Sequence, residues 1–225
     1  MRIKSALGRT LHTLKASEDH PALRRFLIGR LFYTDPINTV IAVMTLYSIN
    51  VAQSSGVTTT SPKIVATWVM FGAVVFAILG GYVAGILVDK WGARLVLRYV
   101  LGTWVLTFVV AASMGLFGLP WQLLLLVSAL AGAALGGTWA ADRPLMLELT
   151  PPDRLGEFYG LYGMVGRFAA IIGPAIWAIS MSVLHRLGWS TLRAQGMSVV
   201  VLLLLILLSQ RLLRPVLQAT PGRNT

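Results

Sequence analysis

Apolar stretches of about twenty residues recur six times along this chain, and short polar segments separate them. A helix of about 20 apolar residues is long enough to cross the hydrocarbon core of a bilayer. The pattern therefore predicts an all-α, polytopic membrane protein with six transmembrane helices. We expect the spans at about residues 25–51, 64–88, 95–117, 121–147, 158–184 and 196–213.

The polarity of the six spans repeats with a period of three. The third and sixth spans are almost purely apolar, as in "VVVLLLLILLSQ", whereas the first, fourth and fifth carry ionisable residues and the second, fourth and fifth are rich in glycine. Nested three-plus-three repeats are a known construction of transporters. We therefore predict a three-plus-three repeat whose third and sixth helices face lipid.

Composition and charge support a membrane location. The chain is 56% hydrophobic with a mean hydropathy of +0.74, and only 12% of its residues are charged, against about 25% in soluble domains. The net charge of +11 could indicate a nucleic-acid partner, but fourteen basic residues fall on one side of the predicted helices and three on the other. Cytoplasmic loops carry such an excess, so we expect no nucleic acid, both termini in the cytoplasm, and the inner (cytoplasmic) membrane as the location.

The domain organisation follows from the same pattern. We expect a basic cytoplasmic leader over residues 1–22, the six-helix bundle over 23–214, and a cytoplasmic tail over 215–225. The chain has no cysteine, and its three histidines lie outside the predicted spans without metal-ligand spacing. We therefore expect no metal, no cofactor and no enzymatic activity.

Glycine-rich faces predict close helix packing. Gly132 and Gly136 share one face of the fourth span with Trp139 and Arg143, and Arg167 shares a face of the fifth span with glycines. Small residues let membrane helices approach closely, so packing is the favoured interpretation of the glycines. Trp139 is a candidate for substrate contact, although aromatic residues near a membrane surface are usually interfacial anchors.

The first span carries an unusual polar stripe for a membrane helix. On a helical wheel Thr34 and Asn38 lie on the same side as Arg30, Asp35 lies at the edge of this stripe, and Pro36 leaves a backbone carbonyl without its helical donor. Charged residues in a span are costly and persist where they face a cavity or a partner. The stripe predicts a kinked, cavity-lining helix.

Two interpretations compete for the charged residues of the spans. Arg30 either reaches the cytoplasmic headgroups or lines the cavity, and the first is favoured because it lies about one turn inside. Asp35 is the candidate proton- or substrate-responsive group, and the neighbouring Tyr33 is a candidate for substrate contact. Asp35 and Arg167 lie at equal depth when counted along their helices, so we predict that they pair.

The segment "GILVDKWGAR" between the second and third spans carries a family motif. Its matching positions are Gly85, Asp89, Lys90, Gly92 and Arg94. This segment resembles the signature loop of the major facilitator superfamily, with Ala93 in place of one basic residue. The segments around "RFLIGRLFYTDPINTV" and "GGTWAADRPLMLELTPPDRLGEFYGLYGMVGR" resemble the second half of one branch of that superfamily, which is related to the yeast vacuolar effluxers linked to autophagy.

The resemblance covers about residues 22–214 and implies the function of the chain. Its relatives are transporters of about twelve helices with a cavity between two six-helix halves, so this chain would supply the second half. The other half would come from a second copy or a separate chain, unless the chain is a truncated gene or a fragment. The resemblance implies a secondary transporter that moves a small solute by alternating access, with amino acids as the substrate class.

No nucleotide-binding signature is present, so we expect a proton or solute gradient to supply the energy. The alternative function is that of a non-transporting membrane assembly partner or a truncated remnant. Such a protein would need the packing glycines but not the polar stripe, which therefore favours transport.

Overall fold

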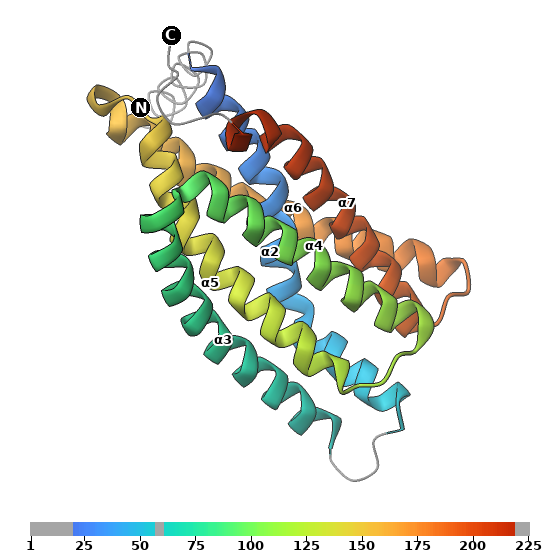
Figure 1. Ribbon diagram of the computed structural model, residues 1–225. Helices are drawn as coiled ribbons and strands as arrows, with labels where there is room; N and C mark the ends of the chain where they lie inside the picture. Colours follow the sequence, from blue (N-terminus) through green and yellow to red (C-terminus); the bar gives the residue numbers. More distant parts are fainter. Residues whose placement is uncertain (1–19, 57–60, 219–225) are drawn as a thin grey trace, which may run out of the picture.

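The computed structural model describes residues 20–56 and 61–218. These residues form a bundle of six long helices with one short 3-10 turn (Figure 1). The elements are α2 (Pro21–Ser54), α3 (Pro62–Trp91), α4 (Ala93–Phe117), α5 (Leu123–Leu149), η2 (Pro152–Arg154), α6 (Leu155–Arg186) and α7 (Thr191–Gln218).

The prediction of six helices is confirmed, and the fold class is all-α. Each helix matches one predicted span and most extend a few residues beyond it, because a helix continues past the apolar core into the polar interface. Five of the six, from α3 to α7, have the length and apolar composition of a membrane span. α2 is longer than any of them but more polar, because the charged and amide residues noted above recur along it.

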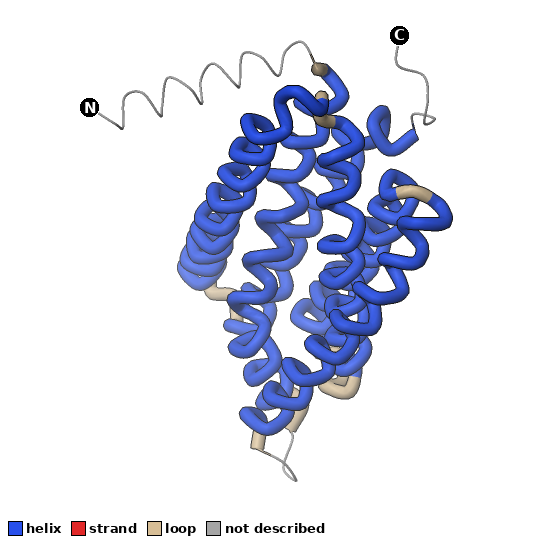
Figure 2. The backbone as a smooth tube through the Cα atoms, turned by 90° about the vertical axis from the view of Figure 1, so that its left-hand side faces the viewer, coloured by secondary structure: helices blue, strands red, loops and turns tan. Residues whose placement is uncertain are grey.

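The expected leader and tail lie mostly outside the described residues. Residues 1–19 and 219–225 are not described, and α7 continues through Gln218, beyond the expected end of the bundle at residue 214. The connections between helices gather at the two ends of the bundle (Figure 2). Successive helices therefore run in alternating directions, as expected for a chain that crosses a membrane six times.

The packing order reveals how the two three-helix units interlock. α5 packs mainly against α3 and α4, while α2 packs mainly against α6 and α7. The first helix of each unit thus contacts the second and third helices of the other unit, and α4 packs against α7 between them. This exchange has the approximate two-fold relationship expected of a three-plus-three repeat.

Glycine allows the tight turn between α3 and α4. Gly92 adopts φ +83° where α3 ends and α4 begins, a conformation that other residues rarely adopt. Its amide donates a hydrogen bond to the carbonyl of Val88 at 2.9 Å, which closes the end of α3. The turn is therefore short, and it sets α4 close to the end of α3.

The glycines of α5 bring its backbone against α3, as the sequence predicts. A Cβ atom added to Gly132 would lie 2.2 Å from the carbonyl oxygen of Ala73, and one added to Gly136 would lie 2.0 Å from that of Ala77. No side chain fits between these backbones. α3 and α5 therefore approach most closely where both helices carry small residues.

We expect Gly136→Ala to destabilise the bundle, because its methyl group would meet the backbone of α3. Overpacking typically costs about 1–3 kcal/mol. Unfolding in mixed detergent micelles measures this cost. Gly163→Ala is the matched control, since a Cβ at Gly163 of α6 meets nothing within 4 Å, and equal losses in the two variants would contradict the assigned contact.

Exposure differs strongly between the helices. α3 and α6 are the least buried of the five apolar helices, and exposed apolar side chains cover much of α3. The third and sixth helices, α4 and α7, pack on one another, and their backbones touch at Gly115 and Gly196. They also carry outward apolar residues such as Leu106 and Leu204. Exposure therefore does not distinguish these two helices from the others, and their lipid contact stays a prediction.

Candidate functional site

A buried polar cluster joins three helices near the end of the bundle where α2 begins. Arg30 of α2 donates through Nε to Oδ2 of Asp142 of α5 at 2.9 Å. Tyr162 of α6 donates its hydroxyl to the same oxygen at 2.6 Å, and Tyr33 of α2 donates to the other oxygen. The carboxylate of Asp142 thus accepts three side-chain hydrogen bonds.

The cluster encloses the guanidinium of Arg30 on several sides. Its Nη1 donates to the carbonyl oxygen of Tyr162 at 3.1 Å, and its Cζ lies 3.6 Å from the centroid of the Tyr162 ring. A Cβ on Gly166 would lie 3.2 Å from Nη1, so the guanidinium also lies close to the backbone of α6 at this glycine. Arg30 is 8% exposed and Asp142 is 4% exposed. The favoured expectation that Arg30 reaches the headgroups is therefore wrong, because a buried carboxylate binds it.

Asp35 lies further along α2 in a different environment. It is 3% exposed, and neither carboxylate oxygen has a hydrogen-bond partner among the described residues. A Cβ on Gly173 of α6 would lie 2.8 Å from Oδ2 of Asp35 and 2.0 Å from the hydroxyl of Thr39. The carboxyl group is thus held against the backbone of α6, next to Pro174, with free acceptor capacity.

The predicted pair between Asp35 and Arg167 is not formed. The described residues contain three ion pairs, which are Arg30–Asp142, Arg94–Glu148 and Arg154–Glu157. Arg167 is exposed on α6, whereas Asp35 is buried between α2 and α6. The two residues lie at similar depth along their helices, but their side chains point to different sides of the bundle.

The polar stripe of α2 divides between two faces. Thr34 and Asn38 are half-buried and Thr45 is exposed, whereas Arg30 and Ser48 face the interior. Thr34, Asn38 and Thr45 share an open face with the apolar Ile41. Part of the stripe is therefore accessible from outside the bundle, as a cavity-lining helix requires, and the charged part is not.

An apolar groove lies beside this open face. Its volume is about 640 Å³, and residues of α2, α3 and α5 line it, including Ile41, Met70, Tyr82 and Trp139. Trp139 is 62% exposed, so its indole is available to a ligand. Arg143 lies one turn further along α5 and is also exposed.

The signature loop lies at the same end of the bundle as the polar cluster. Asp89 and Lys90 are exposed, and Arg94 donates to Glu148 of α5 at 2.9 Å and to the carbonyl of Val216 of α7 at 3.3 Å. A Cβ at Gly85 meets nothing within 4 Å. Gly85 therefore does not mediate a close approach among the described helices, and that contact belongs to Gly80 and Gly81 instead, which lie over Ala133 and Gly136.

The sequence analysis missed Asp142 and Glu148 as charge partners. Asp142 precedes Arg143 in "AADRPL", inside the fourth predicted span. The signal that could have found it is the adjacency of Asp142 and Arg143, because consecutive residues of a helix point about 100° apart and the carboxylate therefore leaves the face of the glycines and Arg143. Among the described residues no group of histidine and carboxylate side chains could hold a metal ion.

The model of a known family matches most of this chain. Residues 37–224 match the model described as "Major Facilitator Superfamily". The chain belongs to the Major Facilitator Superfamily. Membership in this superfamily, together with the apolar helices, identifies a multi-pass membrane protein. The superfamily is one of transporters rather than enzymes.

A curated relative from this superfamily is the "Uncharacterized MFS-type transporter YxiO" of Bacillus subtilis (strain 168). It is 27% identical to the chain over 168 residues, which is 75% of this chain and 36% of the relative. The chain thus spans about a third of the length of its superfamily relative. No solved structure matches the chain.

Proposed function

We propose that this chain is the second six-helix half of a secondary transporter, which moves a small solute by alternating access together with a first six-helix half. The observation that carries the proposal is the group of ionisable residues that α2, α5 and α6 carry within a membrane-spanning bundle. Intramembrane ionisable residues are costly and mark substrate or ion pathways. The proposal extends to the branch related to the yeast vacuolar effluxers, with amino acids as the substrate class.

The open face of the bundle supports a second half. α6 presents Gly160, Gly163 and Arg167 on one exposed face, and nothing in the described chain packs against these two glycines. Glycines on a membrane helix favour close approach of another helix. A second half docked there would cover Arg167, which makes no ion pair with the described residues. A second copy, a separate chain or a longer form of this polypeptide could supply that half.

The proposed solute site lies where the apolar groove meets the open polar face of α2. Ligand sites are mostly apolar with a few well-placed polar groups. Trp139 would supply the apolar contact, while Thr34 and Asn38 would supply hydrogen bonds. Arg143 and Arg167 would carry positive charge to the rim, which suits the carboxylate of an amino acid.

Asp35 is the proposed coupling group. A buried carboxylate without a partner must be neutralised by a proton or a cation, and Asp35 has free acceptor atoms beside the backbone of α6. Uptake or release of that proton would change how α2 packs on α6. The Arg30–Asp142 cluster would hold α2, α5 and α6 together nearer the start of α2, while the packing of α2 on α6 changes at Asp35.

The second candidate function is a membrane partner that does not transport. The uncovered glycine face of α6 supports this function as well as it supports a transporter half, because a helix of any partner could dock on that face. Transport by an assembled complex separates the two functions, since only the first requires a solute pathway.

We expect that the 225-residue chain does not transport as a monomer, because one wall of the proposed cavity is missing. The chain is purified, its mass in detergent is measured, and uptake of radiolabelled amino acids into proteoliposomes is recorded with and without a proton gradient. Robust uptake by a demonstrated monomer would contradict the half-transporter proposal. Absence of uptake from every assembled form, including a form joined to a first half, would favour the non-transporting partner.

We expect a cysteine at Trp91 to react with a membrane-impermeant thiol reagent from the cytoplasmic side only. Trp91 is the last residue of α3 and is 55% exposed, and it lies at the end of the bundle that carries most basic residues. The chain is free of cysteine, so a single labelled site is unambiguous. Leu187→Cys, in the turn between α6 and α7 at the opposite end, is the control and should label from outside. The reverse pattern would overturn the proposed orientation.

A further inference from the structure

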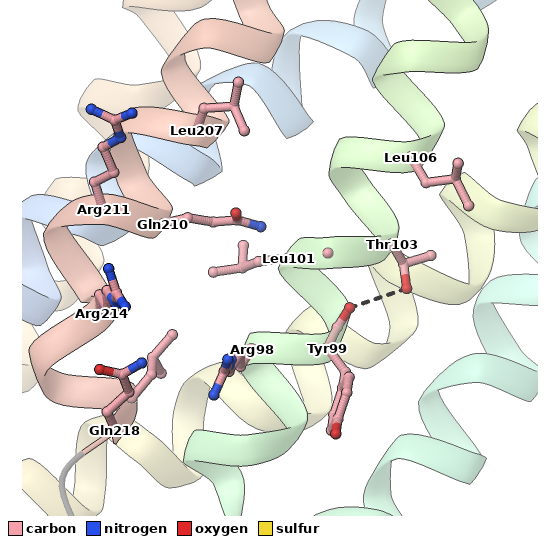
Figure 3. Close-up of a pocket in the computed structure, with 12 residues that line it drawn as sticks. Arg98, Tyr99, Leu101, Thr103, Leu106, Leu207, Gln210, Arg211, Arg214 and Gln218 are labelled. Carbon is pink, nitrogen blue, oxygen red and sulfur yellow. Dashed lines mark hydrogen bonds between the residues drawn. The ribbon is translucent and has the colours of Figure 1, made fainter.

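A second groove lies on the opposite side of the bundle from the proposed solute site. Residues of α4 and α7 line it, its volume is about 750 Å³, and it opens outward between the two helices (Figure 3). It lies near the end of the bundle where α4 begins and α7 ends. None of its lining residues belongs to α2, α5 or α6, so it is separate from the candidate transport pathway.

Three arginines line this groove and form no ion pair with the residues that the structure describes. Arg98 of α4 and Arg211 and Arg214 of α7 line it and are exposed, and Figure 3 shows them on its two sides. None of the three is in an ion pair of the described residues. The neighbouring Arg94, by contrast, is bound to Glu148. Within the described ranges, the groove therefore holds three positive charges that no carboxylate pairs with.

The amides of the groove add hydrogen-bond donors beside these charges. Gln210 and Gln218 of α7 both line it, and in Figure 3 the amide of Gln210 points into the space between the helices. Residues 207, 210, 211, 214 and 218 follow helical spacing, so they form one face of α7. The polar groups are thus collected on facing sides of two helices.

The rest of the groove is apolar and extends toward the middle of the membrane span. Leu106 of α4 lies eight residues beyond Arg98, and Leu207 of α7 lies seven residues before Arg214, which is about 10–12 Å along either helix. Leu101 is fully buried and forms part of the floor. One groove therefore has a cationic zone near the membrane surface and an apolar zone at greater depth.

We propose that this groove binds an anionic phospholipid. The phosphate and its negative headgroup contact Arg98, Arg211 and Arg214, and an acyl chain lies along Leu106 and Leu207. Basic pockets between transmembrane helices bind anionic headgroups, and the order of the two zones matches the order of the parts of a phospholipid in the bilayer. A soluble phosphate compound would use the cationic zone alone and leave the apolar zone empty.

The test measures lipid binding to the full-length chain in detergent by native mass spectrometry. The probes are dioleoyl phosphatidylglycerol and dioleoyl phosphatidylcholine, which share acyl chains and differ in net charge. Each basic residue near an anionic lipid surface contributes about a factor of five in affinity, so the three arginines together should give a preference of about a hundredfold for the anionic lipid. Equal binding of the two lipids would overturn the proposal.

Two triple variants separate this groove from general surface charge. Arg98→Gln with Arg211→Gln and Arg214→Gln should lose the preference. Arg24→Gln with Arg25→Gln and Lys90→Gln removes the same charge from the same end of the bundle and should keep it. Equal loss in both variants would show that only the net charge matters, and would overturn the assigned site.

Two further measurements cover folding and small anions. If the first triple variant does not fold, two other variants replace it. Replacement of the same arginines by lysine keeps the charge and should retain part of the preference for the anionic lipid. The single variant Arg211→Gln decides the question, because it should weaken the preference, and an unchanged preference in this folded variant would overturn the assigned site. Inorganic phosphate at millimolar concentration should not displace the bound lipid. Full displacement would identify a small-anion site and overturn the lipid assignment.

Discussion

Asp142→Asn is expected to lower the free energy of unfolding by about 3–5 kcal/mol, because it leaves Arg30 buried without its charge partner. Arg30 is 8% exposed and donates to the carboxylate that the substitution removes. The hydroxyls of Tyr33 and Tyr162, which also donate to Asp142, would lose a charged acceptor at the same time. Unfolding in mixed detergent micelles measures the loss.

An exposed ion pair supplies the matched control for Asp142→Asn. Glu157→Gln breaks the pair with Arg154, whose partners lie three residues apart near the start of α6, and exposed pairs contribute at most about 1 kcal/mol. A double-mutant cycle with Arg30→Gln adds a second test. The double variant should cost less than the sum of the two single variants, and strictly additive costs would contradict a coupled pair.

Asp35→Asn is expected to have the opposite effect on stability and a large effect on transport. No described group forms a hydrogen bond with the carboxylate oxygens of Asp35, so the substitution strands no partner and removes a buried ionisable group. The free energy of unfolding should stay unchanged or rise. If Asp35 carries the coupling proton, the assembled transporter should lose gradient-driven uptake while still exchanging solute across the membrane.

The exposed Asp153→Asn serves as the control for Asp35→Asn. Asp153 lies in η2 and is exposed, so its neutralisation should change neither stability nor uptake. Gradient-driven uptake that survives Asp35→Asn would refute the coupling role. A loss of stability as large as that of Asp142→Asn would instead show that Asp35 has a binding partner in the assembled protein.

The helices and the closely packed glycine faces of α5 were predictable from sequence for simple physical reasons, although the partner helix was not. Span length is fixed by membrane thickness, so the apolar stretches located all six helices to within a few residues. Gly132 and Gly136 recur at four-residue spacing, which puts both on one face, and they do lie against α3. Gly92 marks the turn between α3 and α4 because its positive φ suits no other residue well.

The charge pairs were not predictable in the same way. Counting residues from a helix end gives depth, but it does not give the rotation of the helix about its axis or its neighbours. Arg167 matched Asp35 in depth and yet points outward, whereas Arg30 reaches α5, which has few contacts with α2. The partner of Arg30 is 112 residues away in sequence, and only the packing order of the helices brings it close.

The interlocked arrangement of the two three-helix units affects how the protein is made. Chains are synthesised from the N-terminus, so α2 leaves the ribosome before the other five described helices, and its main partners α6 and α7 are the last of the six. Arg30 enters the membrane before Asp142 exists, and it must wait in contact with water or the insertion machinery. The six-helix bundle can form only after α7 has been synthesised, and until then the face of α2 that packs against α6 and α7 stays uncovered.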